Sequence, residues 1–143
     1  MDKGRLWTTM DTQVRRRATA VTGPRMVPNT PGVYAWYREG VAVYVGRAIG
    51  RNGLQGRVWK DHLRTGSNLS RSSSRRNVCN HLGIASTART RIRPTVMTPA
   101  EVAPVNTWVS ECEVSWIECK SDREASDLEA RMKAEWKPPL TQR

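Results

Sequence analysis

The chain has 143 residues, which suits one domain with a single core. Apolar residues make up 38% of it, and six tryptophans are too many for a disordered tail, so we expect a folded domain. There are 24 lysine and arginine residues against 13 acidic residues, and the net charge of +11 predicts a polyanionic partner. Residues 62–100 contain no acidic side chain, and most acidic residues follow residue 100.

The lengths of the apolar runs and the cysteine pattern argue against several classes of protein. No apolar run approaches the roughly 18 residues of a membrane span, and the N-terminus lacks the apolar stretch of a secretory signal. We therefore expect a cytoplasmic protein with no membrane partner. The three cysteines contain no CxxC pair, which argues against a disulfide framework. Cys79, His81, Cys112 and Cys119 could ligate zinc, but their spacing is atypical and favours buried thiols.

Residues 1–31 are basic and rich in proline. They contain the run Arg15, Arg16 and Arg17 and show no sustained apolar period. This composition predicts a basic N-terminal arm, with a short helix around residues 12–21. The three arginines are candidates for DNA contacts, and a solvated tail is the alternative.

Residues 32–46 alternate in valine, tyrosine and tryptophan, with a break at residues 38–40. This pattern predicts two strands joined by a hairpin. A three-residue loop would place Tyr34 directly opposite Tyr44 and leave the odd-numbered residues to form the core face. A two-residue loop would instead put the two tyrosines on opposite faces of the sheet. The apolar odd-numbered face favours the three-residue loop.

The rest of the chain predicts further elements. Residues 54–63 fit a short helix in which His62 lies about 140° from Arg57, on the apolar side. Residues 64–107 fit a basic insertion with a helix around 75–82, residues 108–119 fit a strand, and residues 122–136 fit a helix that starts at a capping box of Ser121 and Glu124. We expect an α/β (α+β) fold with a small three-stranded mixed sheet flanked by helices.

Glu129 is unusual because it lies in the apolar stripe of this last helix, between Ala125 and Trp136. An ionised carboxylate that is buried without a partner costs several kcal/mol, so it is expected to meet a cation. A structural ion pair, with Arg57 or an arginine of the insertion, is one interpretation. A metal site is the other.

The order of these features resembles the GIY-YIG nuclease superfamily. Gly32-Val33-Tyr34 is followed by Tyr44-Val45-Gly46, then by Arg57 in a helix and Glu129 in a late helix. The resemblance covers residues 32–143 and implies an endonuclease, a hydrolase that cuts DNA phosphodiester bonds with one Mg²⁺ or Mn²⁺ ion. It implies that Glu129 is the metal ligand and that Arg57 binds the phosphate. Tyr34 and Tyr44 correspond to the active-site tyrosines.

The chain departs from the family pattern at two positions. His62, a further catalytic candidate, follows Arg57 by five residues, whereas family members that use a histidine place it one helical turn later. Thr141 stands where the family often has asparagine. A phenol is a poor base at pH 7 unless a cation lowers its pKa, and Arg47 or Arg57 could do so for either tyrosine.

The basic surface predicts where DNA would bind. Beyond the N-terminal run, the candidate contacts are Arg47, Arg71, Arg75, Arg76, Arg89, Arg91 and Arg93. The substrate could be double- or single-stranded DNA, and a homodimer would suit restriction-like cleavage of a duplex. The alternatives are a non-catalytic nucleic-acid-binding module on the same fold and an unrelated RNA-binding protein.

Overall fold

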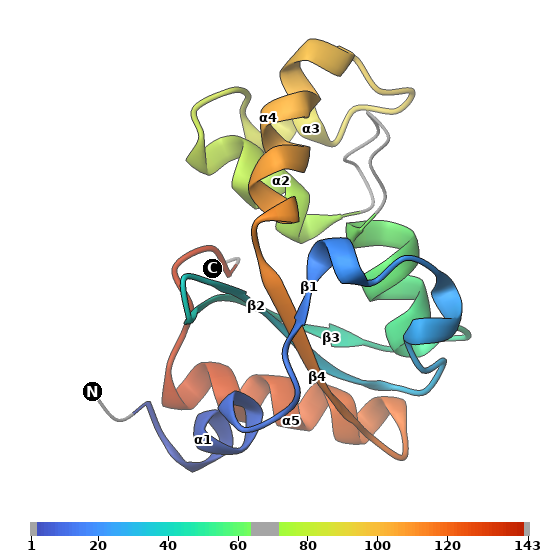
Figure 1. The fold of residues 1–143 in the computed structure, drawn as a ribbon, viewed down its shortest axis with the longest axis vertical. Helices are drawn as coiled ribbons and strands as arrows, with labels where there is room; N and C mark the ends of the chain where they lie inside the picture. The colour runs from blue at the N-terminus through green and yellow to red at the C-terminus, as the bar shows by residue number, and fades with distance from the viewer. Residues whose placement is uncertain (1–2, 64–71, 142–143) are drawn as a thin grey trace.

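The computed structural model describes residues 3–63 and 72–141 and shows an α+β fold (Figure 1). Its α-helices are α1 (Arg5–Asp11), α2 (Ser73–His81), α3 (Thr87–Thr90), α4 (Pro99–Ser110) and α5 (Asp122–Glu135). Its strands are β1 (Arg16–Arg17), β2 (Gly32–Arg38), β3 (Val41–Ala48) and β4 (Glu113–Glu118). Two 3₁₀ turns, η1 (Ala18–Ala20) and η2 (Pro24–Met26), precede β2, and the π-helix η3 (Gln55–His62) follows β3. Within the described ranges, no helix has the length and apolar content needed to cross a bilayer.

The strands form one antiparallel sheet in the order β1-β4-β2-β3. The α+β class is confirmed, whereas the prediction of a three-stranded mixed sheet is wrong. A fourth strand is present because Arg16 and Arg17 pair with the edge of β4. β2 is antiparallel to both of its neighbours, so β3 and β4 run in the same direction and are joined by a crossover that contains several helices.

The hairpin between β2 and β3 turns in two residues instead of the predicted three. Glu39 and Gly40 form the turn, with φ angles of 53° and 79°. A turn with two left-handed residues matches the twist of the strands that it joins. Taken alone, this turn would place the two tyrosines on opposite faces.

A β-bulge in β3 restores their common face. The pairing slips by one residue at Val43. Tyr44 therefore lies opposite Trp36, and Tyr34 lies opposite Gly46. The prediction that Tyr34 and Tyr44 are directly opposed is wrong, but both belong to the same buried cluster, so the prediction of a shared face is confirmed.

The sheet is buried on both faces. One face packs Val33, Ala35 and Tyr37 against α1 and α5, which lie together along one side of the sheet in Figure 1. The opposite face carries the tyrosine pair and packs against η1 and η3. The two-residue turn pairs Val41 with Arg38, away from the predicted core face, and Val41 is 55% exposed.

The segment before β2 is packed on the domain and is not a free arm. Trp7 of α1 is fully buried, and its Nε1 donates to the carbonyls of Met132 and Trp136, at 2.9 Å in both cases. The predicted helix over 12–21 is wrong, because α1 lies earlier and β1 is extended to pair with β4.

The predicted last helix is confirmed to within one residue as α5. Ser121 Oγ accepts a hydrogen bond from the Glu124 amide at 3.1 Å and so caps the helix start. Ala125 and Met132, two members of the predicted stripe, are fully buried. α5 thus presents its apolar stripe, and Glu129 with it, to the sheet.

The predicted insertion folds as a helical lobe of α2, α3 and α4 at one end of the sheet (Figure 1). The helix expected around 75–82 is confirmed as α2. The strand expected from residue 108 is wrong at its start, because α4 continues to Ser110 and β4 begins at Glu113. The lobe has its own buried cluster of Val78, Cys79, Met97, Val102 and Val105.

Candidate active site

Tyr34 and Tyr44 lie side by side on the face opposite α5. Their ring centroids are 6.2 Å apart with an interplanar angle of 28°, and the residues are 2% and 6% exposed. Gly46 makes this arrangement possible, because a Cβ at that position would collide with the Tyr34 hydroxyl. The glycine of the second tripeptide therefore provides the space in which the Tyr34 ring crosses β3.

The helix that carries Arg57 and His62 is a π-helix. The Leu63 amide donates to the Val58 carbonyl at 3.0 Å, a hydrogen bond that spans five residues. Residues five apart are therefore neighbours along this helix. The offset of 140° assumed the 100° per residue of an α-helix, which this winding does not have. The prediction that His62 lies on the apolar side is confirmed, since it is 1% exposed.

His62 is buried, with partners at both ring nitrogens. Its Nε2 lies 2.6 Å from the Tyr34 hydroxyl, and its Nδ1 lies 2.5 Å from Ser72 Oγ and 2.9 Å from Ser74 Oγ. When Nε2 accepts from Tyr34, the proton on Nδ1 is donated to a serine hydroxyl. These contacts fix the ring between the tyrosine pair and the start of α2.

Burial determines the charge of this group of side chains. It lowers the pKa of His62 to about 3, and three nearby guanidinium groups act in the same direction, so the ring is neutral at pH 7. Burial also raises the pKa of Tyr34 well above its ordinary value, although the positive charge of Arg57 opposes this rise. The site at rest therefore pairs a neutral phenol with a neutral imidazole.

His62 should make the fold sensitive to acid. Because its folded-state pKa is lowered, the stabilisation is present above the unfolded-state pKa of about 6.5 and is lost as the pH falls toward 3. Between pH 7 and pH 4 we expect the free energy of unfolding to fall by on the order of 3 kcal/mol more in the wild type than in His62→Gln. Urea unfolding at each pH measures this, with the exposed His81→Gln as control. If the free energy of unfolding falls with pH equally in the two variants, the burial of a neutral His62 is contradicted.

Glu129 meets the tyrosines in an open pocket of about 450 Å³, which we call the tyrosine pocket. Its lining residues are Tyr34, Tyr44, Val45, Gly46, Arg47, Arg57, Ser73, Glu129, Lys133 and Thr141. The Glu129 side chain is 14% exposed, and Lys133 Nζ lies 3.5 Å from its Oε1. Arg57 pairs with Asp61 instead, at 3.4 Å, so among the described residues the structural pair predicted between Arg57 and Glu129 is not formed.

Thr141 lines the same pocket and has a structural contact. It is 5% exposed, and its Oγ1 accepts a hydrogen bond from the Val45 amide at 3.0 Å. The Leu140 amide donates to the Val43 carbonyl at 2.8 Å. The segment after α5 thus covers the outer edge of β3 on both sides of Tyr44 and helps to fix that side chain.

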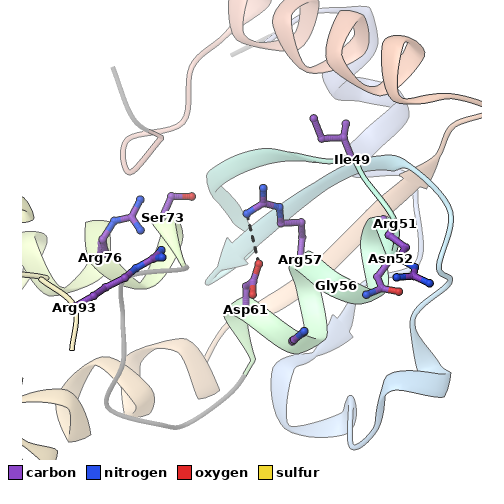
Figure 2. A pocket seen from close by; sticks show the side chains of 11 residues that line it. Ile49, Arg51, Asn52, Gly56, Arg57, Asp61, Ser73, Arg76 and Arg93 are labelled. Carbon is purple, nitrogen blue, oxygen red and sulfur yellow. Dashed lines mark hydrogen bonds and ion pairs between the residues drawn. The ribbon is translucent and has the colours of Figure 1, made fainter. Parts of the chain in front are cut away.

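The predicted DNA-binding arginines separate by their surroundings. Arg76 and Arg93 line a second pocket beside Arg57 (Figure 2). Arg75 is 1% exposed and donates to Asn106 Oδ1 at 2.7 Å, so burial takes it out of reach of DNA and that prediction is wrong. Four of the other arginines contact protein groups: Arg47 donates to Ser126, Arg89 is paired with Glu101, Arg15 stacks on Tyr37, and Arg16 stacks on Trp116. Arg17 and Arg91 are exposed, and Arg71 lies outside the described residues.

Two residues of the site were missed in the sequence. The Ser73 hydroxyl is hydrogen-bonded to the Tyr44 hydroxyl, and Lys133 pairs with Glu129. The serine run at 72–74 could have been recognised as a helix start, since Ser72 caps α2. Lys133 follows Glu129 by four residues, the spacing at which helical side chains meet.

The cysteines give no support to the zinc alternative. Cys112 lies in the tyrosine-face cluster, whereas Cys79 lies in the helical lobe. Burial raises the pKa of Cys112 and of Cys119 to about 11, so both are thiols at neutral pH. Within residues 3–63 and 72–141, no three histidine, cysteine or acidic side chains gather around a common point.

Comparison with known proteins gives no relative for this chain. No protein-family model, no curated protein and no solved structure matches it. The chemistry of the tyrosine pocket and the resemblance of its tripeptides are therefore the basis on which a function can be assigned.

Proposed function

We propose that this chain is an endonuclease that hydrolyses phosphodiester bonds in DNA with the help of a divalent ion, Mg²⁺ or Mn²⁺. The supporting observation is that two phenols, a guanidinium group and a carboxylate from four separate elements line one open pocket. They belong to Tyr34 on β2, Tyr44 on β3, Arg57 on η3 and Glu129 on α5. These are the residues that the resemblance to the GIY-YIG superfamily implies.

Glu129 suits a hard cation. Mg²⁺ binds through one or two carboxylates and retains several waters, and the tyrosine pocket offers one carboxylate beside open space. The contact with Lys133 is a long pair between neighbouring turns, worth a fraction of a kcal/mol, and would yield to a divalent ion. When bound, the ion would polarise the scissile phosphate and stabilise the leaving oxygen.

Arg57 would hold the phosphate in this proposal. Its side chain is 45% exposed, lines the tyrosine pocket and pairs with Asp61. A guanidinium group binds two phosphate oxygens through parallel hydrogen bonds. Arg57 would thus orient the phosphodiester and stabilise the negative charge that develops on its non-bridging oxygens.

Tyr34 is better placed than Tyr44 to take the proton of the attacking water. Its hydroxyl contacts a proton acceptor, His62 Nε2, whereas the Tyr44 hydroxyl contacts Ser73. As the Tyr34 oxygen takes a proton from water, its own proton passes to Nε2. A phosphate beside Arg57 offsets part of the positive charge that lowers the pKa of His62, which makes the imidazole a stronger acceptor.

The ion pair of Glu129 also favours a second candidate, a nucleic-acid-binding module without catalysis. A carboxylate that is paired with Lys133 needs no metal ion, and the net charge of +11 is sufficient for phosphate binding. Such a module would bind DNA equally well with and without a divalent ion.

The test is to incubate the protein with supercoiled plasmid and with a labelled single strand, in Mg²⁺, Mn²⁺ or EDTA. We expect cutting with either metal ion and none in EDTA. Nicked circles would indicate cleavage of one strand at a time, and linear plasmid would indicate two copies acting together. Intact DNA in every buffer, with tight binding, would overturn the nuclease in favour of the binding module.

A further inference from the structure

A second pocket, of about 480 Å³, adjoins the tyrosine pocket and shares Arg57 and Ser73 with it. We call it the arginine pocket, because five cationic side chains line it: Arg51, Arg57, Lys60, Arg76 and Arg93. Figure 2 shows Arg76 and Arg93 extending from one side toward the pair of Arg57 and Asp61 on η3. The arginine pocket is therefore a cationic extension of the candidate active site.

The balance of charge in this pocket favours an anion. Among the described residues that line the pocket, Asp61 is the one acidic residue, and it is paired with Arg57. Burial lowers the pKa of Arg76, and the charges of Arg91 and Arg93 act in the same direction. The binding of an anion between cations in a concave site reduces the electrostatic repulsion among them.

The geometry identifies phosphate as the chemical class. Guanidinium groups bind phosphate oxygens in pairs, and the pocket receives them from three segments: residues 51–60, α2 and the chain after α3. Arg57 stands between the two pockets, so an anion in the arginine pocket would lie next to a phosphate at Glu129. Phosphates that follow one another are a property of a nucleic-acid strand, and free di- or triphosphates share the chemistry.

We propose that the arginine pocket binds a second phosphate of the DNA strand, next to the phosphate that is cut. This inference rests on the proposed function and deepens it, because it assigns the phosphate next to the cleaved bond to a separate set of side chains. The strand passes Arg57, which touches both phosphates, and continues toward Lys60 and Arg93. A strand that ends before the arginine pocket loses these contacts.

The test measures binding without catalysis. A short fluorescein-labelled DNA is titrated in EDTA at several salt concentrations, with the wild type and with Lys60→Gln combined with Arg93→Gln. Both side chains are exposed, so the fold should hold, and thermal melting checks this. The matched control is Arg123→Gln with Arg131→Gln, which removes the same charge from exposed positions on α5.

We expect the pocket variant to weaken DNA binding by roughly tenfold and to lower the slope of log affinity against log salt by about one. The control pair should change neither by a comparable amount. Equal effects of the two pairs would overturn the subsite. Because no step of this test requires cleavage, its result is independent of the plasmid assay. The binding assay can support the subsite even if no DNA is cut, and the plasmid assay can support the nuclease even if the subsite is overturned.

Inorganic pyrophosphate distinguishes the two sources of phosphate. A strand subsite predicts that pyrophosphate competes weakly with DNA and that the pocket variant binds DNA more weakly than the wild type. If pyrophosphate instead raises the melting temperature of the wild type strongly, and DNA affinity is the same in wild type and pocket variant, the ligand is a free polyphosphate and the strand proposal is overturned.

Discussion

Replacement of Glu129 by glutamine is expected to lower metal-dependent DNA cleavage by about a thousandfold or more. Glutamine keeps the size and one oxygen of the side chain but loses the charge that a hard cation requires. A metal ion supplies several kcal/mol of stabilisation to a phosphoryl transition state, and about 1.4 kcal/mol corresponds to a factor of ten in rate. The rate of plasmid cutting in Mg²⁺ and Mn²⁺ measures the loss.

Asp127→Asn is the matched control for this substitution. Asp127 is exposed on the same helix, two residues before Glu129, and its replacement removes the same charge. Cleavage by the control should stay near the wild-type rate, and both variants should still bind DNA in EDTA. If Glu129→Gln cuts DNA at the wild-type rate, the Glu129 carboxylate has no role in catalysis. An equal loss in both variants would assign the effect to overall charge.

The tyrosine pair shows how far the sequence alone can lead. The two tripeptides predict a hairpin, and the strands lie within two residues of the predicted span. Their register could not be predicted, because it depends on the turn and on the bulge at Val43 together. Each would move Tyr44 to the other face, and the two effects cancel. The correct shared face was thus predicted from an incorrect pairing.

His62 shows a different limit. A helical wheel at 100° per residue places it away from Arg57, and nothing in residues 54–63 signals a π-helix. Leu54 and Val58 of this segment are fully buried against the sheet, in long-range contacts that the local sequence does not show. A departure from regular helix geometry at a functional site is itself common for π-helical turns.

The helical lobe was the least predictable region, although part of its signal is visible. Thr98, Pro99 and Glu101 form a capping box with proline at the first helical turn, which marks the start of α4. The alternation around Trp108 favoured a strand there and masked the helix. Arg75, in the same lobe, was expected on a DNA surface, but its burial depends on α4 packing beside α2.

Tyr34→Phe is expected to lower the cleavage rate by about a hundredfold to ten thousandfold, the range for loss of a general base. Phenylalanine fills the same space beside Gly46 but breaks the path from water to His62 Nε2. Tyr44→Phe should cost less, because its hydroxyl contacts Ser73, whose hydroxyl is a far weaker base than an imidazole. DNA affinity in EDTA should be unchanged in both.

Tyr37→Phe separates catalysis from stability. Tyr37 lies on the opposite face of the sheet and donates to Asp11 Oδ1 at 2.7 Å, so its loss should destabilise the fold by about 1 kcal/mol without a change in the cleavage rate. Single-turnover cleavage and urea unfolding of the three variants give the comparison. If Tyr44→Phe loses more activity than Tyr34→Phe, the base is Tyr44, and the contact between Tyr34 and His62 serves only to hold the site in place.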